Sequence, residues 1–302
     1  MPEYTVALGT FDGLHIGHKA VLNNILSKNA KPIALTFKMP PKMSESSGLL
    51  MLPEEKNKTL EKMGITPVVL DFENIKNLSP REFLEHILSE YNPKTIATGF
   101  NFRFGKSAVG ETKDLNEFCE ENKIEYKLTK AVKFENQPVS STRIRDCLAK
   151  GNIVSANKML GRPFSFSGKV IHGDERGREM GFPTINQVYP DILTKVKFGV
   201  YASITQIGNE FFTSVTNVGK RPTFETEKVI SETNIIDFSG DLYNENIKIH
   251  LLEFIRPEVK FDGIDGLKKG IEADKNIAIE IFDKIGYNNK NIIIQKFDSA
   301  LN

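Results

Sequence analysis

The stretch that decides the fold of the first half is Gly9-Thr10-Phe11-Asp12-Gly13-Leu14-His15-Ile16-Gly17-His18. A short apolar strand over residues 5–8 runs into this glycine turn, and helical spacing follows over residues 18–26. Histidines three positions apart at a helix start project from one face. Because a helix N-terminus offers free N–H groups and positive dipole, the turn predicts a phosphate-binding site.

Strands and helices alternate outward from this turn. The sequence predicts strands over residues 32–37, 68–70, 95–98 and 125–128. It predicts helices over residues 53–63, from the Ser79-Pro80 cap onward, over 115–122 and over 143–159. This alternation indicates an α/β domain with a parallel sheet covered on both faces, which binds ligands beyond the carboxyl ends of its strands.

The pattern changes from about Phe164 onward. Short β-rich runs cover residues 168–171, 199–204, 210–218, 230–238 and 247–255, with Gly, Asn and Asp turns between them. Such runs predict an antiparallel barrel or sandwich, and helical spacing returns over residues 267–285. We therefore expect two domains, residues 1–160 and 161–302.

Composition narrows the class of protein. The chain has 302 residues, of which 39% are hydrophobic and 26% charged, as in folded soluble proteins of two domains. A net charge of +1 disfavours nucleic-acid binding through a strong basic field. Cys119 and Cys147 stand far apart, which disfavours a disulfide framework or a zinc site. Neither a signal peptide nor a long apolar run is present, so we expect a cytoplasmic protein without a membrane partner.

Three clusters in the first half carry candidate chemistry. His15 and His18 could donate hydrogen bonds to a triphosphate and stabilise charge on departing pyrophosphate, while Gly17 lets phosphate approach the backbone. Residues 140–145 read Ser-Ser-Thr-Arg-Ile-Arg, in which one hydroxyl suffices for helix capping and the others favour a phosphate clamp. Residues 99–106 are rich in aromatics, which fit a base or flavin ring, although this element taken alone favours core packing.

The second half holds a glycine-rich, charged segment over residues 172–186. Its Arg176 and Arg178 suit a flap over a phosphate, and a polar hairpin explains the same composition. Thr184 and Asn186 face one side of an extended segment, and their oxygens suit Mg²⁺ bound with phosphate. Glu232 lies in a β-rich run, where a carboxylate is either a structural ion-pair partner or a general base.

The first half resembles the nucleotidyltransferase superfamily marked by H-x-G-H and S-T-x-I-R, and more narrowly the FMN adenylyltransferase half of bacterial bifunctional FAD synthetases. The resemblance implies a Rossmann-like domain in which ATP phosphates are contacted by the matching residues His15, His18, Ser141, Thr142 and Arg145. Of these, His15, His18 and Arg145 are the expected catalytic residues. The expected nucleotide-binding set also includes Gly9, Phe11, Gly17, Asn101 and, in the second half, Gly173.

Residues 166–275 resemble riboflavin kinase. The matching elements are G-F-P-T-x-N at 181–186, G-V-Y-A at 199–202, N-x-G-x-R-P-T-F at 217–224, Glu232, G-D-L-Y at 240–243 and F-I-R-P-E-x-K-F at 254–261. The resemblance implies a six-stranded Greek-key barrel with a C-terminal helix. It also implies that Thr184 and Asn186 hold Mg-ATP and that Glu232 is the base for the 5′-hydroxyl of riboflavin.

Two positions depart from the family pattern. The family's T-F-D-P-H-P reads Thr-Phe-Lys-Met-Pro-Pro at residues 36–41, and its E-x-H reads Glu232-Thr233-Asn234. The resemblance implies that the loop over residues 36–41 lies on the flavin side of the first site. The expected function is two-step synthesis: riboflavin and ATP give FMN, then FMN and a second ATP give FAD and pyrophosphate, with Mg²⁺ as cofactor. The alternatives are a family member that has lost one activity, a flavin-binding protein without turnover, and adenylyl transfer to another acceptor.

Overall fold

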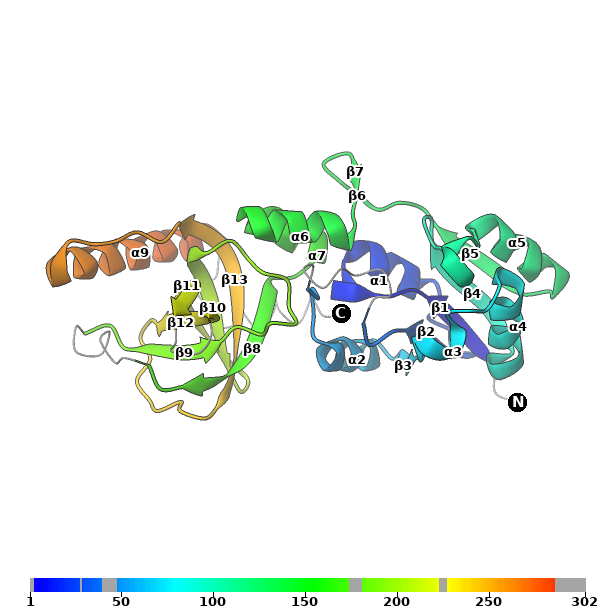
Figure 1. Cartoon of the computed structure of the whole chain (residues 1–302), viewed down its shortest axis with the longest axis horizontal. Coiled ribbons are helices and arrows are strands. Elements are labelled where there is room, and N and C mark those ends of the chain that lie inside the picture. The colour runs from blue at the N-terminus through cyan, green and yellow to red at the C-terminus, as the bar shows by residue number, and fades with distance from the viewer. Residues whose placement is uncertain (1–2, 28, 40–47, 174–180, 223–226, 286–302) are drawn as a thin grey trace. The chain divides into compact units, whose positions relative to one another are not determined.

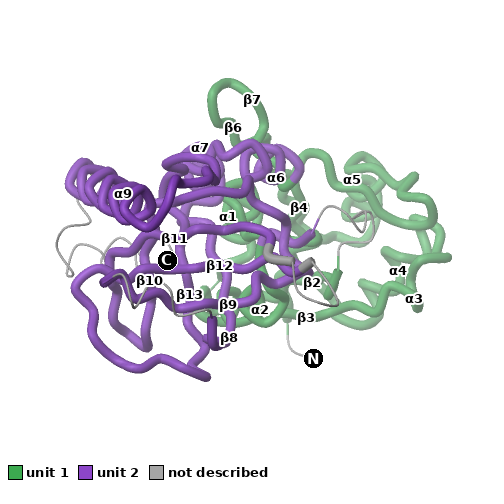
Figure 2. The backbone as a smooth tube through the Cα atoms, turned by 60° about the vertical axis from the view of Figure 1, so that its left-hand side comes forward, with its two compact units in different colours: residues 1–45, 51–141, 301–302 green, residues 46–50, 142–300 purple. Residues whose placement is uncertain are grey.

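The computed structural model describes residues 3–27, 29–39, 48–173, 181–222 and 227–285 (Figure 1). These residues form two compact units (Figure 2). Unit 1 holds the described residues up to 39 together with 51–141, and unit 2 holds residues 48–50 together with those from 142 onward. Each unit has its own sheet, as expected for separate α/β and β-rich halves.

Unit 1 contains a five-stranded parallel sheet in the order β3-β2-β1-β4-β5. Its strands are β1 (Tyr4–Leu8), β2 (Lys31–Thr36), β3 (Thr66–Val69), β4 (Pro93–Gly99) and β5 (Glu125–Thr129). Its helices are α1 (Ile16–Asn23), α2 (Pro53–Lys62), α3 (Phe72–Ile75), α4 (Pro80–Tyr91) and α5 (Thr112–Glu121). Two short 3-10 turns, η1 (Asp12–Leu14) and η2 (Lys106–Ala108), and the hairpin of β6 (Lys133–Phe134) and β7 (Gln137–Pro138) complete it. The predicted parallel sheet is confirmed.

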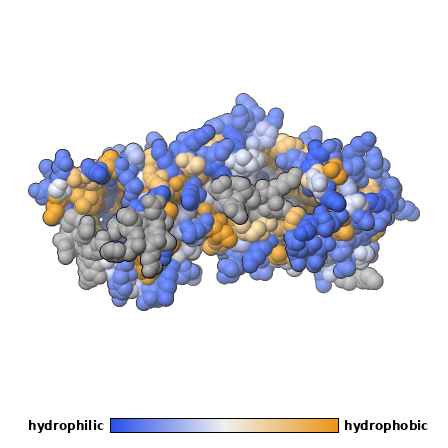
Figure 3. Space-filling model, viewed as in Figure 1, coloured by the Kyte–Doolittle hydropathy of each residue, from blue (hydrophilic) through white to orange (hydrophobic). Residues whose placement is uncertain are grey.

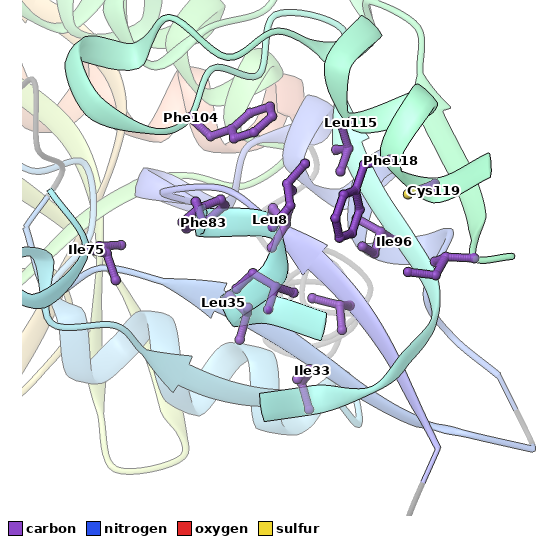
Figure 4. Close-up of a cluster of buried hydrophobic side chains, with 14 residues drawn as sticks. Leu8, Ile33, Leu35, Ile75, Phe83, Ile96, Phe104, Leu115, Phe118 and Cys119 are labelled. Carbon is purple, nitrogen blue, oxygen red and sulfur yellow. The ribbon is translucent and has the colours of Figure 1, made fainter. Parts of the chain in front are cut away.

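The two faces of this sheet differ in side-chain size because successive residues of a strand point to opposite sides. Large aliphatic residues of β1, β2 and β4 pack with residues of α4 and α5 in one cluster (Figure 4). The residues between them, Ala7, Ala34 and Ala97, belong to a second cluster with α1 and α2. Small side chains at the centre of that face leave room for the two helices to lie close to the strands.

Unit 2 contains a closed barrel in the order β10-β11-β12-β9-β8-β13. Its strands are β8 (Phe164–Ile171), β9 (Thr184–Val188), β10 (Gly199–Ile207), β11 (Glu210–Pro222), β12 (Glu227–Ile235) and β13 (Asn246–Arg256). Its helices are α6 (Ser141–Lys150, whose first residue belongs to unit 1), α7 (Ile153–Leu160) and α9 (Gly263–Ile285). All neighbouring strands are antiparallel, and β9 pairs with β12 after the β10–β11–β12 meander, which is Greek-key order.

The barrel interior is unusual in its polarity, because five fully buried hydroxyls cross it as one hydrogen-bonded chain. Adjacent oxygens along the chain lie 2.8–2.9 Å apart. Its members are Thr205, Ser214, Ser203, Thr216 and Thr233. A hydroxyl can donate and accept at once, so each buried group in the chain can be satisfied without water.

Several elements differ from the sequence expectation. The single helix predicted over residues 143–159 is two helices, because Gly151 takes a left-handed φ of 82° and ends α6. Strand β9 was expected only as an extended segment, and α3 and the β6–β7 hairpin were not expected. The helix predicted over 18–26 begins at Ile16, because the His15 side chain caps it. It ends at Asn23, after which Asn24 and Ile25 close a tighter turn.

Within the described residues, no helix is both long and apolar enough to cross a membrane. The face shown in Figure 3 is mainly hydrophilic, with separate hydrophobic areas between the hydrophilic residues. Exposed hydrophobic residues are therefore scattered, as is usual on a protein surface.

An ion pair joins helix α9 to strand β13 of the barrel. The Arg256 Nε donates to Asp274 Oδ1 over 2.8 Å, and its Nη2 donates to Asp274 Oδ2 over 2.6 Å. The Asp274 side chain is 6% exposed, whereas that of Arg256 is 25% exposed. The helix also buries Ala278 and Phe282 against the barrel residues Val200 and Leu252.

We predict that D274A lowers the free energy of unfolding of the barrel unit by about 2–3 kcal/mol, because it leaves a partly buried guanidinium without its carboxylate. Urea unfolding of the whole chain measures this cost. The matched control is E272A on the same helix, where Glu272 and Lys275 lie 3.8 Å apart at the surface. That pair should contribute under about 0.5 kcal/mol. Equal costs for D274A and E272A would contradict the anchoring role.

Candidate active sites

The chain order of the parallel sheet reverses between β1 and β4, which lie side by side. Successive strands run β1, β2, β3 toward one edge and β4, β5 toward the other. In open parallel sheets a crevice forms at such a reversal, outside the carboxyl ends of the two strands. The histidine turn follows β1 and the Gly99–Gly105 element follows β4, so both predicted clusters leave the sheet at this position.

The turn after β1 is made of left-handed backbone. Phe11, Gly13 and Leu14 have φ values of 50°, 79° and 43°. A left-handed conformation costs a non-glycine residue about 1–2 kcal/mol, so Phe11 and Leu14 must be held by their surroundings. Both side chains are about 1% exposed and lie in the core cluster on the alanine face of the sheet. Phe11, expected in the nucleotide-binding set, thus has its ring in the core, where it meets Gly9 and the edge of His18.

His15 and His18 lie directly against each other. Their rings are stacked with centroids 3.5 Å apart and planes inclined by 15°. The backbone N–H of His18 donates to His15 Nδ1 over 3.2 Å, so His15 is the N-cap of α1. Since Nδ1 is an acceptor, the proton of neutral His15 is on Nε2, which makes Nε2 a donor. A Cβ on Gly17 would stand 3.2 Å from the His15 ring, so this glycine leaves room for the ring.

The charge state of His18 is set by its surroundings. Removal of the ring from water, followed by the charges of His15 and Lys56, holds the pKa of His18 well below its usual value. His18 is therefore neutral at neutral pH and offers one N–H donor. Its Nδ1 is buried and has no hydrogen-bond partner within the described part of the chain. A neutral imidazole binds an anion through its N–H donor rather than through a full positive charge.

The hydroxyl and arginine cluster begins at the end of unit 1. The Ser141 Oγ donates to the Asp12 carbonyl over 3.1 Å, and both residues belong to unit 1. Thr142 and Arg145 follow in α6 and belong to unit 2. The Arg145 Nε donates to the Gly48 carbonyl over 2.9 Å.

The aromatic element after β4 divides between core and surface. Phe102 and Phe104 stack with centroids 5.6 Å apart and join the large-residue cluster, as the core-packing interpretation predicted. Phe100 is 44% exposed. Asn101 is exposed as well, and its Oδ1 lies 3.7 Å from where a Cβ of Gly99 would stand.

The predicted site residues of unit 2 share one face of the barrel. Residues directly opposite in an antiparallel pair point to the same side of the sheet. Glu232 of β12 is opposite Asn186 of β9 and opposite Asn217 of β11. Thr184 of β9 is opposite Asn234 of β12. The structure therefore brings together the hydroxyl, amide and carboxylate that the sequence placed far apart.

Asn234, where the family pattern has histidine, has a clear contact. Its Nδ2 donates to the Pro183 carbonyl over 2.8 Å and so holds the segment that enters β9 just before Thr184. On the other side of β9, a Cβ on Gly173 would stand 2.4 Å from the Asn186 Nδ2. Arg176 and Arg178 of the predicted flap lie outside the described residues, as do residues 40–41 and 223–224.

Two polar residues near these sites were not singled out from the sequence. Lys56 lies on the helix predicted over residues 53–63, yet it is only 5% exposed. A charged residue on the apolar face of an amphipathic helix was the available signal. Asn217 was part of a matching element without an assigned role, and its Oδ1 is buried with no hydrogen-bond partner within the described ranges.

The first unit has a parallel sheet with a histidine turn, the second has a closed barrel with a Thr, Asn and Glu face, and together they indicate a transferase. A family model described as FAD synthetase matches residues 2–143, and one described as riboflavin kinase matches residues 160–282. Curated bifunctional riboflavin kinase/FMN adenylyltransferases are similar along nearly the whole chain. The protein from Listeria monocytogenes is 34% identical and that from Bacillus subtilis 33%, each alignment covering 93% of both chains.

The chain belongs to the bifunctional riboflavin kinase/FMN adenylyltransferase family, and both domains of that family are present. A crystal structure from Streptococcus pneumoniae, described as a macrolide-efflux protein, has the same fold. It aligns with a TM-score of 0.82 and 31% identity over 92% of this chain and 94% of that one. The aligned region includes both units.

We predict that unit 1 loses stability as the pH falls below about 6.5, the ordinary histidine pKa. The pKa of folded His18 is lowered, so the unfolded chain binds the proton first and protonation favours unfolding. The stability contributed by neutral His18 is thus present above the unfolded pKa and lost below it. Urea unfolding of wild type and H18Q between about pH 7.5 and 5.5 measures this, and H18Q should lose less. An equal loss in both proteins would contradict the assignment.

We predict that G173A raises the KM for ATP in riboflavin phosphorylation about tenfold, because its new methyl group displaces the Asn186 amide. Stability should change little, since the displaced atom is the end of a flexible side chain. The control is G266A in α9, where a Cβ meets nothing closer than Phe261 Cβ at 3.7 Å. Steady-state kinetics on both variants measure the KM for ATP. An unchanged KM in G173A would contradict the assignment of Asn186 to the ATP site.

Proposed function

We propose that the chain makes FAD from riboflavin in two steps at two separate sites. Residues 161–302 transfer the γ-phosphoryl group of ATP to riboflavin, which gives FMN and ADP. Residues 1–160 then join FMN to the AMP portion of a second ATP, which gives FAD and pyrophosphate. The observation that carries the proposal is the pairing of Glu232 with Asn186 and of Asn234 with Thr184 in the barrel. A separate pair of stacked histidines follows β1 of the parallel sheet.

In the phosphorylation step, Glu232 accepts the proton of the 5′-hydroxyl as its oxygen attacks the γ-phosphorus. The bond to the β-phosphate oxygen breaks and ADP leaves. Thr184 and Asn186 present a hydroxyl and an amide oxygen on one side of β9, a donor set suited to Mg²⁺ bound together with phosphate. When bound, Mg²⁺ neutralises phosphate charge. Asn234 fixes the entry to β9 through Pro183 and so keeps Thr184 in register with β12.

In the adenylylation step, a phosphate oxygen of FMN attacks the α-phosphorus of ATP and pyrophosphate leaves. His15 and the neutral His18 donate hydrogen bonds to the phosphates, and Arg145 adds positive charge as the leaving group develops its own. Ser141, Thr142 and the backbone at Gly9 and Gly17 bind the nucleotide, with Asn101 at the end of β4. No covalent intermediate is needed, because positioning and charge stabilisation carry the step.

The two departures from the family pattern are compatible with both activities. The Asn234 amide has a structural contact that keeps the kinase face assembled. The altered residues Lys38 and Met39 follow β2, and the histidine turn itself is complete. Because both domains of the family are present, retention of both activities is better supported than loss of one. The cytoplasmic location stays a prediction.

We predict that H18A and E232Q affect different steps. H18A should lower FAD formation from FMN about 100-fold, because it removes one donor to the phosphates. It should leave FMN formation from riboflavin unchanged. E232Q should lower FMN formation at least about 100-fold, because it removes the base, and leave FAD formation from FMN unchanged. Chromatography of products from each substrate measures both. If either variant lost both activities while still folded, the assignment of one site to each half would be wrong.

A further inference from the structure

Lys56 is a lysine buried in the interior of unit 1. It lies on α2 and is only 5% exposed. Its Nζ donates to the Phe37 carbonyl over 2.7 Å, to Thr36 Oγ1 over 2.9 Å and to the Thr10 carbonyl over 3.2 Å. An ammonium group has three N–H donors, and all three are used in these bonds. The side chain is thus committed to the protein itself rather than to a ligand.

The three acceptors lie at the carboxyl ends of two neighbouring strands. Thr10 follows β1, while Thr36 and Phe37 end and follow β2. The Thr10 carbonyl accepts a second bond, from Thr36 Oγ1 over 2.8 Å. Lys56 therefore joins Thr10, which directly precedes the left-handed residues of the histidine turn, to Phe37, the first residue beyond β2. Such a turn needs outside contacts to hold its conformation, and this ammonium supplies them at its base.

Stability alone explains Lys56 poorly. Burying an ammonium costs several kcal/mol, and three bonds to neutral acceptors return about the same amount. An apolar side chain of similar length would avoid the cost of removing the charge from water. Burial lowers the pKa of Lys56 to about 8, and the charge of Asp12 opposes this shift. Compared with an apolar residue, Lys56 holds its three acceptor oxygens at fixed positions and places a positive charge near His18.

We propose that Lys56 is a positioning residue of the adenylylation site, which holds the histidine turn and residues 37–39 at one fixed spacing. The inference rests on the proposed function of the front half. The nucleotide side of the site begins at the turn, and the resemblance puts the segment after β2 on the flavin side. Lys56 contacts both through their backbone carbonyls, so it sets how the two substrates meet without touching either.

We predict that K56M lowers kcat for FAD formation from FMN about tenfold or more, with a smaller change in the KM for ATP. Misplacement of reacting groups lowers the rate of the step more than it lowers the affinity for either substrate. FMN formation from riboflavin, measured on the same sample, should stay within about twofold of wild type. The matched control is K58M, which removes an exposed lysine two positions along the same helix and should leave both activities unchanged.

A pH profile separates positioning from a merely structural role. His18 is influenced by the charges of His15 and Lys56, and Lys56 by that of Asp12. Removal of the Lys56 charge raises the pKa of His18, so the acid limb of FAD formation should move to higher pH in K56M and not in K58M. If K56M does not fold, kcat and the acid limb are measured on K56Q instead, because its amide retains hydrogen-bond donors but has no charge.

The result that overturns the inference is a K56M or K56Q enzyme whose kcat and acid limb match those of K58M. A loss of both activities in parallel with a lowered unfolding midpoint would also overturn it, since that pattern shows a structural role. Failure of the proposed function gives a different pattern, because wild-type protein would then form no FAD from FMN before any variant is compared.

Discussion

The parallel sheet of this protein depends on an alternation of side-chain size along its central strands. Large aliphatic residues of β1, β2 and β4 bury against α4 and α5, whereas the alanines between them let α1 and α2 lie close on the other face. That close approach puts the histidine turn and Lys56 at the same edge of the sheet, where β1 and β2 end. A larger residue at Ala7 or Ala34 would separate α1 and α2 from the strands, and the site with them.

The barrel differs from the parallel sheet in where its polar residues lie. It presents polar site residues on an outer face, and its small interior is also lined with polar hydroxyls. Strand pairing fixes the outer face: Thr184, Asn186, Asn217 and Glu232 share it through the β9–β12–β11 register. A slip of one residue would turn them inward and bring the buried hydroxyls out. The interior hydroxyl chain makes such a slip costly, since every partner along it would be lost. Register and site are thus held by the same interactions.

Much of this could be predicted from the sequence, because apolar periodicity and turn residues are local signals. The parallel sheet, the β-rich half and the histidine turn follow from them, and Thr184 and Asn186 were expected on one side of an extended segment. The end of α6 at Gly151 was not predicted, because a glycine within a helical pattern does not by itself indicate a positive φ. The register that joins Glu232 to Asn186 and the burial of Lys56 were not predicted, because both depend on contacts between residues distant in sequence.

The central claim is that one chain holds two working sites, each within its own half. The most direct measurement is chromatography of the products formed by purified protein with ATP and Mg²⁺, incubated with riboflavin in one sample and FMN in another. The account predicts FAD in both samples, with FMN appearing first in the riboflavin sample. FMN without FAD, FAD only from supplied FMN, or no product from oxidised or reduced flavin would each contradict it.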